Sequence, residues 1–118
     1  MTAPNVVNVQ TITGKTAQTS LTTTTANIIT NAANSSTLVK LNNVILTNFS
    51  ANTLTANVGL LRNNTITYIA GGPSIPPYST LILLAKDVTL YLEEADVLQA
   101  NASANSAMNI IASYEIIS

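Results

Sequence analysis

Hydrophobic and polar residues alternate along most of the chain, with the period of two that is typical of half-buried β-strands. The clearest example lies within residues 53–62. Its apolar positions are Leu54, Ala56, Val58 and Leu60. Branched Thr, Val and Ile side chains are common in such segments, and they favour a pleated strand over a helix. The pattern therefore predicts an all-β protein.

Strands are expected wherever alternating segments are bounded by turn-forming residues. These segments cover residues 7–11, 21–30, 38–49, 53–62, 65–70, 79–85, 88–93, 98–103 and 108–117. They amount to about eight short strands at even spacing, which favours an antiparallel two-sheet β-sandwich over β-α-β units. Periodicity alone leaves both a jelly-roll and an Ig-like topology open.

Turn-forming residues separate the expected strands. The Gly-Lys pair at 14–15 is expected to form a turn after the first strand. The Asn pair at 63–64 tolerates positive φ and is expected to join two strands in a hairpin, whereas the pair at 42–43 marks either a bulge or a hairpin. Residues 71–77 hold two glycines and three prolines, so they predict a loop between the two halves of the chain.

Two strands show apolar residues on both faces. In residues 79–85, Leu81, Leu83 and Ala85 face opposite to Ile82 and Leu84. In residues 108–117, one face carries Ile110, Ala112, Tyr114 and Ile116, and the other carries Ile111 and Ile117. A strand that is apolar on both faces needs cover on both.

Charged residues are scarce, with 4 Lys plus Arg and 5 Asp plus Glu among 118 residues, or 8%. A free domain normally keeps about a quarter of its residues charged. The composition therefore indicates that copies of the chain or other partners cover much of its surface. The cations are scattered and the net charge is −1, so nucleic acid is not an expected partner. No run approaches the roughly 18 apolar residues of a membrane span, so no membrane partner is expected.

The length of 118 residues fits a single β-sandwich domain. Pro4 biases the first residues towards an extended conformation, so an N-terminal arm over about residues 1–5 is expected. Its residues Thr2, Ala3, Pro4 and Asn5 are candidates for contact with a neighbouring subunit, because strand addition satisfies exposed sheet edges. A loose terminus is the alternative interpretation.

Candidate chemistry is sparse, because the chain has no His and no Cys. The usual base and nucleophile pairs of enzymes are missing, so no enzymatic activity, catalytic residue or cofactor is expected. One acidic cluster, Glu93, Glu94 and Asp96, follows Tyr91. Its spacing differs from that of an EF-hand, which favours a solvated turn over a Ca²⁺ site. These four residues are expected to form a contact surface at the sandwich rim.

Four motifs form a series in the last third of the chain. They are a Pro-led Ser-Thr-Leu strand from Pro77, a Lys-Asp turn at 86–87, the strand end Tyr-Leu-Glu-Glu at 91–94 and a terminal Ser-Tyr-Glu at 113–115. This series resembles small virion structural proteins of tailed phages, especially cyanophages. Ala95 stands where that family usually has Gly. The Thr-rich start and the loop at 30–36 agree with weaker motifs.

The resemblance implies a non-enzymatic virion component that is made in the host cytoplasm and incorporated in many copies. The first expectation is a capsid cement or decoration protein, a trimer or other homo-oligomer that binds the major capsid protein across neighbouring capsomers. The alternative is a tail, baseplate, neck or fibre-attachment subunit. A carbohydrate-binding module is the third interpretation, which the aromatic content of 4% disfavours.

Overall fold

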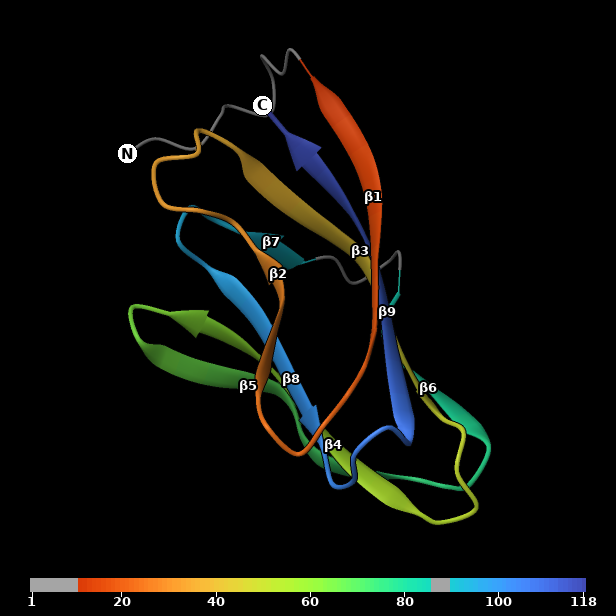
Figure 1. Cartoon of the computed structure of the whole chain (residues 1–118). Coiled ribbons are helices and arrows are strands. Elements are labelled where there is room, and N and C mark those ends of the chain that lie inside the picture. The colour runs from red at the N-terminus through yellow and green to blue at the C-terminus, as the bar shows by residue number, and fades with distance from the viewer. Residues whose placement is uncertain (1–10, 86–89) are drawn as a thin grey trace.

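Two antiparallel β-sheets face each other in the computed structural model of the chain, which describes residues 11–85 and 90–118 (Figure 1). The described residues form nine strands and no helix. The strands are β1 (Ile12–Ser20), β2 (Ala26–Thr30), β3 (Leu38–Asn48), β4 (Leu54–Arg62), β5 (Thr65–Ile75), β6 (Ser79–Leu84), β7 (Leu90–Leu92), β8 (Val97–Ala102) and β9 (Met108–Ile117). The expected all-β, two-sheet sandwich is therefore confirmed.

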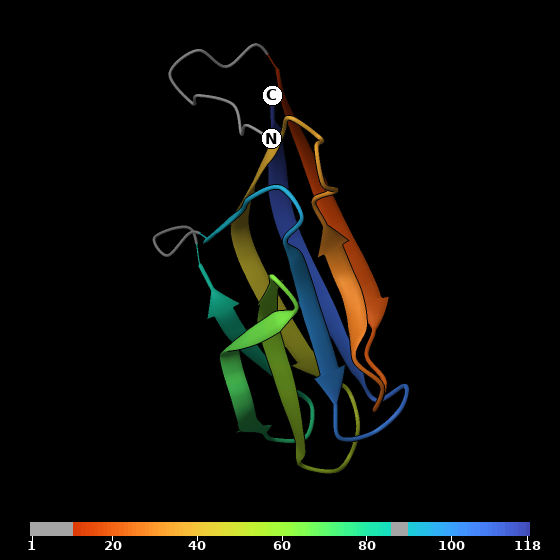
Figure 2. The same cartoon turned by 90° about the vertical axis from the view of Figure 1, so that its left-hand side faces the viewer.

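The strand order selects one of the two topologies that the sequence left open. Sheet A has the order β1-β9-β3-β6, with β7 also pairing with β3, and sheet B has the order β2-β8-β4-β5. Figure 2 views the sandwich with sheet B in front of sheet A. Apart from the β4–β5 hairpin and the step from β6 to β7, every connection passes from one sheet to the other. This arrangement is that of a jelly roll.

The hydrophobic core fills the space between the inner faces of the two sheets. Alternate positions of each strand supply it, as expected for side chains that point to opposite faces of a pleated strand. Residues from β3, β4, β8 and β9 are fully buried there: Leu41, Val44, Leu46, Val58, Leu98, Met108, Ile110 and Ala112. The alternation predicted for residues 53–62 is confirmed, because Leu54, Ala56 and Val58 all belong to this core.

The β4–β5 hairpin was also predicted correctly. Asn63 and Asn64 adopt positive φ angles of 53° and 61°, and Arg62 pairs with Thr65 across the turn. Two consecutive positive φ angles suit the right-handed twist of the flanking strands. The pair at 42–43 forms a bulge within β3 rather than a turn. At that bulge the Asn43 side-chain oxygen accepts a hydrogen bond from the Ser113 N–H at 3.1 Å.

The turn predicted at Gly14-Lys15 is wrong, because both residues lie inside β1. All nine residues of β1 pair with β9 in one unbroken register. The chain turns later, between Leu21 and β2, where the Thr24 N–H donates to the Thr22 hydroxyl at 3.2 Å. Threonine hydroxyls compete with strand pairing by bonding to nearby backbone, so this Thr run forms a connection and not the start of a strand. Of the first predicted strand, 7–11, residues 7–10 lie outside the described residues.

The loop predicted at residues 71–77 is wrong over its first part, because β5 continues to Ile75. β5 is the outer strand of sheet B, so Pro73 can lack an N–H on the solvent side without disturbing the pairing with β4. Gly72 has a φ of 79° where the register shifts between Thr55 and Asn57. The extra residues are accommodated as a bulge.

In the part of the chain that the structure describes, no helix has the length and apolar character needed to cross a membrane. The Lys86-Asp87 turn and the N-terminal arm lie outside the described residues.

Candidate functional site

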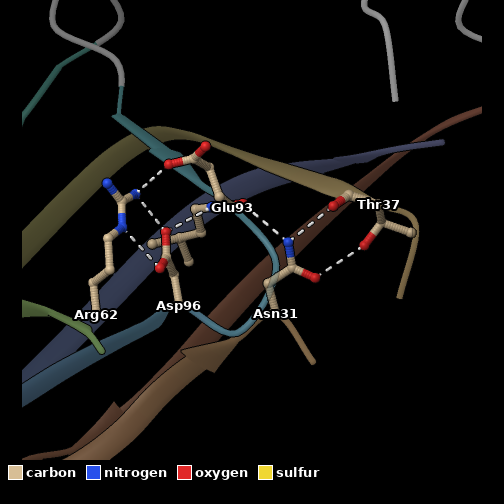
Figure 3. Close-up of polar contacts among 6 residues, drawn as sticks. Asn31, Thr37, Arg62, Glu93 and Asp96 are labelled. Atoms are coloured by element: carbon tan, nitrogen blue, oxygen red, sulfur yellow. Dashed lines mark hydrogen bonds and ion pairs between the residues drawn. The ribbon is translucent and has the colours of Figure 1, made fainter. Parts of the chain in front are cut away.

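The acidic turn between β7 and β8 is built around the buried carboxylate of Asp96, which is 2% exposed. Arg62, at the end of β4, donates to it through two bonds, Nε to Oδ1 at 2.9 Å and Nη2 to Oδ2 at 2.6 Å (Figure 3). The Glu93 N–H also donates to Oδ2, at 2.8 Å. Two parallel bonds between a guanidinium and a carboxylate are among the stronger polar contacts in proteins. The pair joins the β4–β5 hairpin of sheet B to the turn that leaves sheet A.

Glu93 makes a second and weaker ion pair with the same arginine. Its Oε2 lies 2.8 Å from Arg62 Nη2, and the two side chains are 59% and 43% exposed. Such solvated pairs contribute little to stability. The hydrogen bond to Asp96, with the charges of Asp96 and Glu93, raises the pKa of Arg62 above its ordinary value, although partial burial opposes this. Arg62 therefore remains a fixed positive charge.

The backbone of the turn takes a conformation that normally favours glycine. Ala95 has a φ of 70°, and the Asp96 N–H closes the turn on the Glu93 carbonyl at 3.0 Å. The Ala95 N–H donates to the Asn31 carbonyl at 2.7 Å. This chain thus adopts a glycine-type geometry with a side chain present.

Asn31 joins the β2–β3 loop to this turn through hydrogen bonds. Its side-chain nitrogen donates to the carbonyls of Thr37 and Leu92, each at 3.0 Å, and its side-chain oxygen accepts from the Thr37 hydroxyl (Figure 3). The same oxygen accepts from the Ser35 hydroxyl at 2.7 Å. Its N–H donates to the Asp96 carbonyl at 3.0 Å. Asn31 is buried, and all of its polar groups are satisfied.

Glu94 and Asp96 do not form the solvated contact surface that the sequence predicted. Glu94 is 7% exposed, and its Oε2 accepts a hydrogen bond from the Ser36 N–H at 3.2 Å. Its Oε1 has no hydrogen-bond partner among the described residues. Within 11–85 and 90–118, no three carboxylates gather where they could hold a metal ion. Asp96 and Glu94 thus stabilise the turn and the neighbouring loop, and Glu93 is the member of the cluster that faces solvent.

Tyr91 is the predicted contact residue that lies on an outer face. It is 43% exposed in β7 and pairs with Lys40 of β3. The arm residues Thr2, Ala3, Pro4 and Asn5 lie outside the described residues. Of the predicted contact residues that the structure describes, Tyr91 and Glu93 are exposed, and Glu94 and Asp96 are buried.

An apolar row crosses the outer face of sheet A, and site prediction from the sequence missed it. Ile111 of β9 pairs with Ile45 of β3, which pairs with Ile82 of β6. Ile82 is 62% exposed and Ile111 is 40% exposed. Exposed large apolar side chains that line up on one surface mark contact sites more often than scattered ones do. The signal was present in the sequence as strands that are apolar on both faces.

The outer face of sheet B differs, because polar side chains there bond to one another across the strands. Gln99 donates to Asn27 at 2.8 Å, and Asn57 donates to Asn101 at 3.0 Å. Asn101 in turn donates to the Thr25 hydroxyl at 3.1 Å. Polar groups that satisfy each other leave less to offer a ligand, so the outer face of sheet A is the better candidate for a contact surface.

The exposed tyrosines do not form a common platform for a sugar ring. Tyr68 lies on β5 of sheet B, Tyr91 on β7 of sheet A, and Tyr78 in the connection between β5 and β6. Sugar recognition by aromatic stacking requires rings placed on one surface. This separation gives no support to the carbohydrate-binding interpretation.

No protein-family model and no curated protein sequence matches the chain. A solved structure of a Bacillus endospore appendage protein, described as part of a novel family of disulfide-linked pili, is similar with a TM-score of 0.56. The match covers 100% of this chain and 96% of the other, at 8% sequence identity. At this identity, the likeness shows a shared fold.

Proposed function

We propose that this chain is a non-enzymatic structural subunit of a tailed-phage virion and acts as a capsid cement or decoration protein. The sequence resemblance supports a virion component. The low content of charged residues, 8%, supports a chain whose surface is covered in its working state. The observation that carries the proposal is the row formed by Ile111, Ile45 and Ile82 on the outer face of sheet A.

The mechanism of a cement protein is mechanical. Each copy buries apolar surface against neighbouring capsid subunits, and burial stabilises by about 25 cal/mol for each Å² removed from water. A contact of ordinary size buries about 800 Å² on each partner. The cement protein binds the assembled shell, and this binding lowers the free energy of the shell relative to its expanded state. A ligand stabilises the folded state of a protein in the same way.

The similarity to an endospore appendage protein is compatible with an assembly role, since that protein is described as forming pili. Those pili are described as disulfide-linked, whereas this chain contains no cysteine. Contacts between its copies therefore cannot be disulfide-linked. Strand pairing and apolar burial are the contacts that its composition offers.

A tail, baseplate, neck or fibre-attachment subunit remains the second candidate, because the same composition and fold serve any multi-copy particle component. Copy number separates the two, since capsid shells repeat their subunits hundreds of times and tail rings use small multiples of three or six.

The test is quantitative mass spectrometry of this chain in separated heads and tails of the purified particle, relative to the major capsid protein. Hundreds of copies in the heads would support the cement function. A few to a few tens of copies in the tails would replace it with the tail function. Absence from both fractions would overturn the virion proposal altogether.

A further inference from the structure

β1 forms one edge of sheet A, and none of the described residues pairs along its outer side. Figure 2 shows β1 at the right-hand margin of the sandwich. It is nine residues long and pairs with β9 without a register shift. Its side chains are exposed on both faces, except for the half-buried Ala17. A long edge strand without a bulge, left unpaired on one side by the described residues, is a template for pairing with another chain.

The pairing with β9 reveals which backbone groups point outward. Thr11 and Ser118 exchange two hydrogen bonds, N–H to carbonyl, at 3.0 and 2.9 Å. At the other end the Leu21 N–H donates to the Met108 carbonyl at 2.7 Å, in the same register. The backbone N–H and carbonyl groups of successive residues point to opposite sides of a strand. The odd-numbered residues of β1 therefore bond to β9. The even-numbered residues direct their N–H and carbonyl groups outward: Ile12, Gly14, Thr16, Gln18 and Ser20.

The other sheet edges carry features that oppose pairing. β5 contains Pro73 and two register shifts against β4. β2 is five residues long with a shift between Asn27 and Ile29. The remaining edge is divided between β6, of six residues, and β7, of three. Prolines, bulges, short strands and charged side chains, especially Lys, are the usual means by which proteins block edge pairing. Lys15 is the one such feature of β1, and its side chain is placed in the register below. β1 has no proline and no bulge, and it is nine residues long.

We propose that β1 pairs antiparallel with β1 of a second copy of this chain, about a two-fold axis at Thr16. In this register Thr16 faces Thr16 of the second copy, Gly14 faces Gln18, and Ile12 faces Ser20. The outward-pointing residues therefore meet each other. Five facing pairs with two bonds each give about ten new backbone hydrogen bonds.

The side chains of β1 are compatible with this register. Lys15 faces Ala17 of the second copy, so the two lysines lie diagonally and not directly opposite, where like charges are destabilising. The central pair, threonine against threonine, is a favourable cross-strand combination. An isologous contact of this kind closes as a dimer and does not grow further.

The dimer would join two copies of sheet A into one continuous sheet. A two-fold axis perpendicular to that sheet places both outer faces on the same side, so the two rows of Ile111, Ile45 and Ile82 would form one larger apolar surface. This inference deepens the proposed function by naming the contact between copies, and it rests on that function only for the dimer's role in a particle.

The test uses the purified chain alone, so its failure would leave the copy-number test of the proposed function untouched. Sedimentation velocity at about 100 μM should give twice the chain mass of 12.3 kDa, which is 24.6 kDa. Thr16→Glu and Thr16→Lys each place like charges face to face and should weaken the dimer about fivefold. Mixing the two variants should restore it, because opposite charges then meet. Thr67→Glu, on the exposed edge strand β5, is the matched control and should dimerise as the wild type does.

Thr16→Pro provides a second variant. It should leave the fold intact, because the Thr16 N–H points away from β9, and should weaken the dimer about tenfold or more. A wild-type chain that stays monomeric up to about 1 mM would overturn the proposal. Dissociation of the dimer by Thr67→Glu would also overturn the proposal. The same holds if Thr16→Glu dissociates the dimer and mixing with Thr16→Lys does not restore it, since either result indicates a different contact.

Discussion

Two buried asparagines hold the loops at the opposite ends of β3. Asn31 lies before the strand begins, and Asn48 is its last residue. The Asn48 side chain donates to the carbonyls of Asn52 at 2.8 Å and Ile75 at 3.0 Å, and accepts from the Ser50 N–H at 3.0 Å. An amide side chain carries both donors and an acceptor, so it can replace the ladder bonds that are lost where strands end.

The pair formed by Arg62 and Asp96 should contribute more stability than the pair formed by Arg62 and Glu93. Asp96→Ala removes both arginine bonds and leaves the Glu93 N–H without its acceptor, so a loss of about 2–3 kcal/mol in the free energy of unfolding is expected. Glu93→Gln removes a solvated charge and should change stability by less than about 0.5 kcal/mol. Urea unfolding of both variants measures this. Equal losses would contradict the assignment of Asp96 as the central residue.

The contribution of Arg62 should not depend on its own titration near neutral pH. A cation whose pKa is raised on folding stabilises fully below its pKa in the unfolded chain, and this contribution is lost only as pH rises through the higher folded pKa. For an arginine both values lie far above neutrality. The difference in unfolding free energy between wild type and Arg62→Gln should therefore be constant between about pH 7 and about pH 9, measured at fixed ionic strength. A difference that shrinks over this range would indicate another titrating group.

Ala95→Gly should stabilise the protein. The left-handed conformation at a φ of 70° costs an alanine about 1 kcal/mol, which glycine avoids, although glycine's freedom in the unfolded chain offsets part of the gain. A net gain of about 0.5 kcal/mol is expected from thermal or urea unfolding. Ala51→Gly, at an exposed position without positive φ, is the control and should bring a small loss.

Strand position explains why turn-forming residues occur inside two strands. β5 contains Gly71, Gly72 and Pro73, and β1 contains Gly14. Both are edge strands, with a neighbour on one side among the described residues. An edge strand tolerates a missing donor or a bulge because its other side faces solvent. In β3 or β9, which have neighbours on both sides, a proline would remove a ladder bond whichever neighbour its N–H faced.

Glycines in β4 and β1 should respond oppositely to the same substitution. A Cβ at Gly59 would lie 2.8 Å from Ile66 Cγ1 and 3.0 Å from the Thr67 carbonyl oxygen, so Gly59→Ala should destabilise by about 1–3 kcal/mol. At Gly14 nothing lies within 4 Å, so Gly14→Ala should gain about 0.5–1 kcal/mol. Unfolding curves of both variants test this. Adding Ile66→Ala to Gly59→Ala should recover part of the loss, and additive losses would show that Ile66 is not the obstacle.

At the scale of the whole molecule, the two sheets present different surfaces. The outer face of sheet A is crossed by exposed isoleucines, whereas that of sheet B carries a ladder of amides and hydroxyls that bond to each other. The low content of charged residues, 8% of the whole sequence, leaves few charges for either face. One side of the sandwich is thus suited to an apolar contact and the other to solvent.

Ile82→Lys should reduce incorporation into the particle without unfolding the chain. The side chain is already 62% exposed, so the fold loses little. A buried isoleucine contributes about 1.5–3 kcal/mol at a contact, so the copy number at limiting concentration should fall roughly tenfold or more. Asn27→Lys, on the outer face of sheet B, adds the same charge and should be incorporated normally. Equal incorporation of both variants would exclude the sheet A face as the contact.

The alternating pattern was sufficient to predict the fold class and to sort the apolar residues of β4 and β9 onto their two faces, and the Asn63-Asn64 pair was sufficient to predict the hairpin. These features depend only on residues that are adjacent in the sequence. Side chains alternate between the two faces of a strand whichever strand it pairs with. The acidic turn was misjudged for the opposite reason. The burial of Asp96 depends on Arg62, 34 positions earlier in the chain, and the spacing of acidic residues contains no information about that partner.

The sequence by itself determined the segments that form β3, β4, β6, β8 and β9, because side-chain alternation and turn propensity are local properties. Only the tertiary structure decided the jelly-roll strand order and the burial of Glu94 and Asp96. It also decided that β1 continues past Gly14 and that β5 continues past Pro73. Each of these depends on whether a strand is central or at an edge, and on which distant group lies opposite. Pairing between strands that are far apart in the sequence sets the position of each strand in its sheet and the group that lies opposite each residue. The sequence pattern has a period of two whichever strands pair, so it does not reveal which pairing forms.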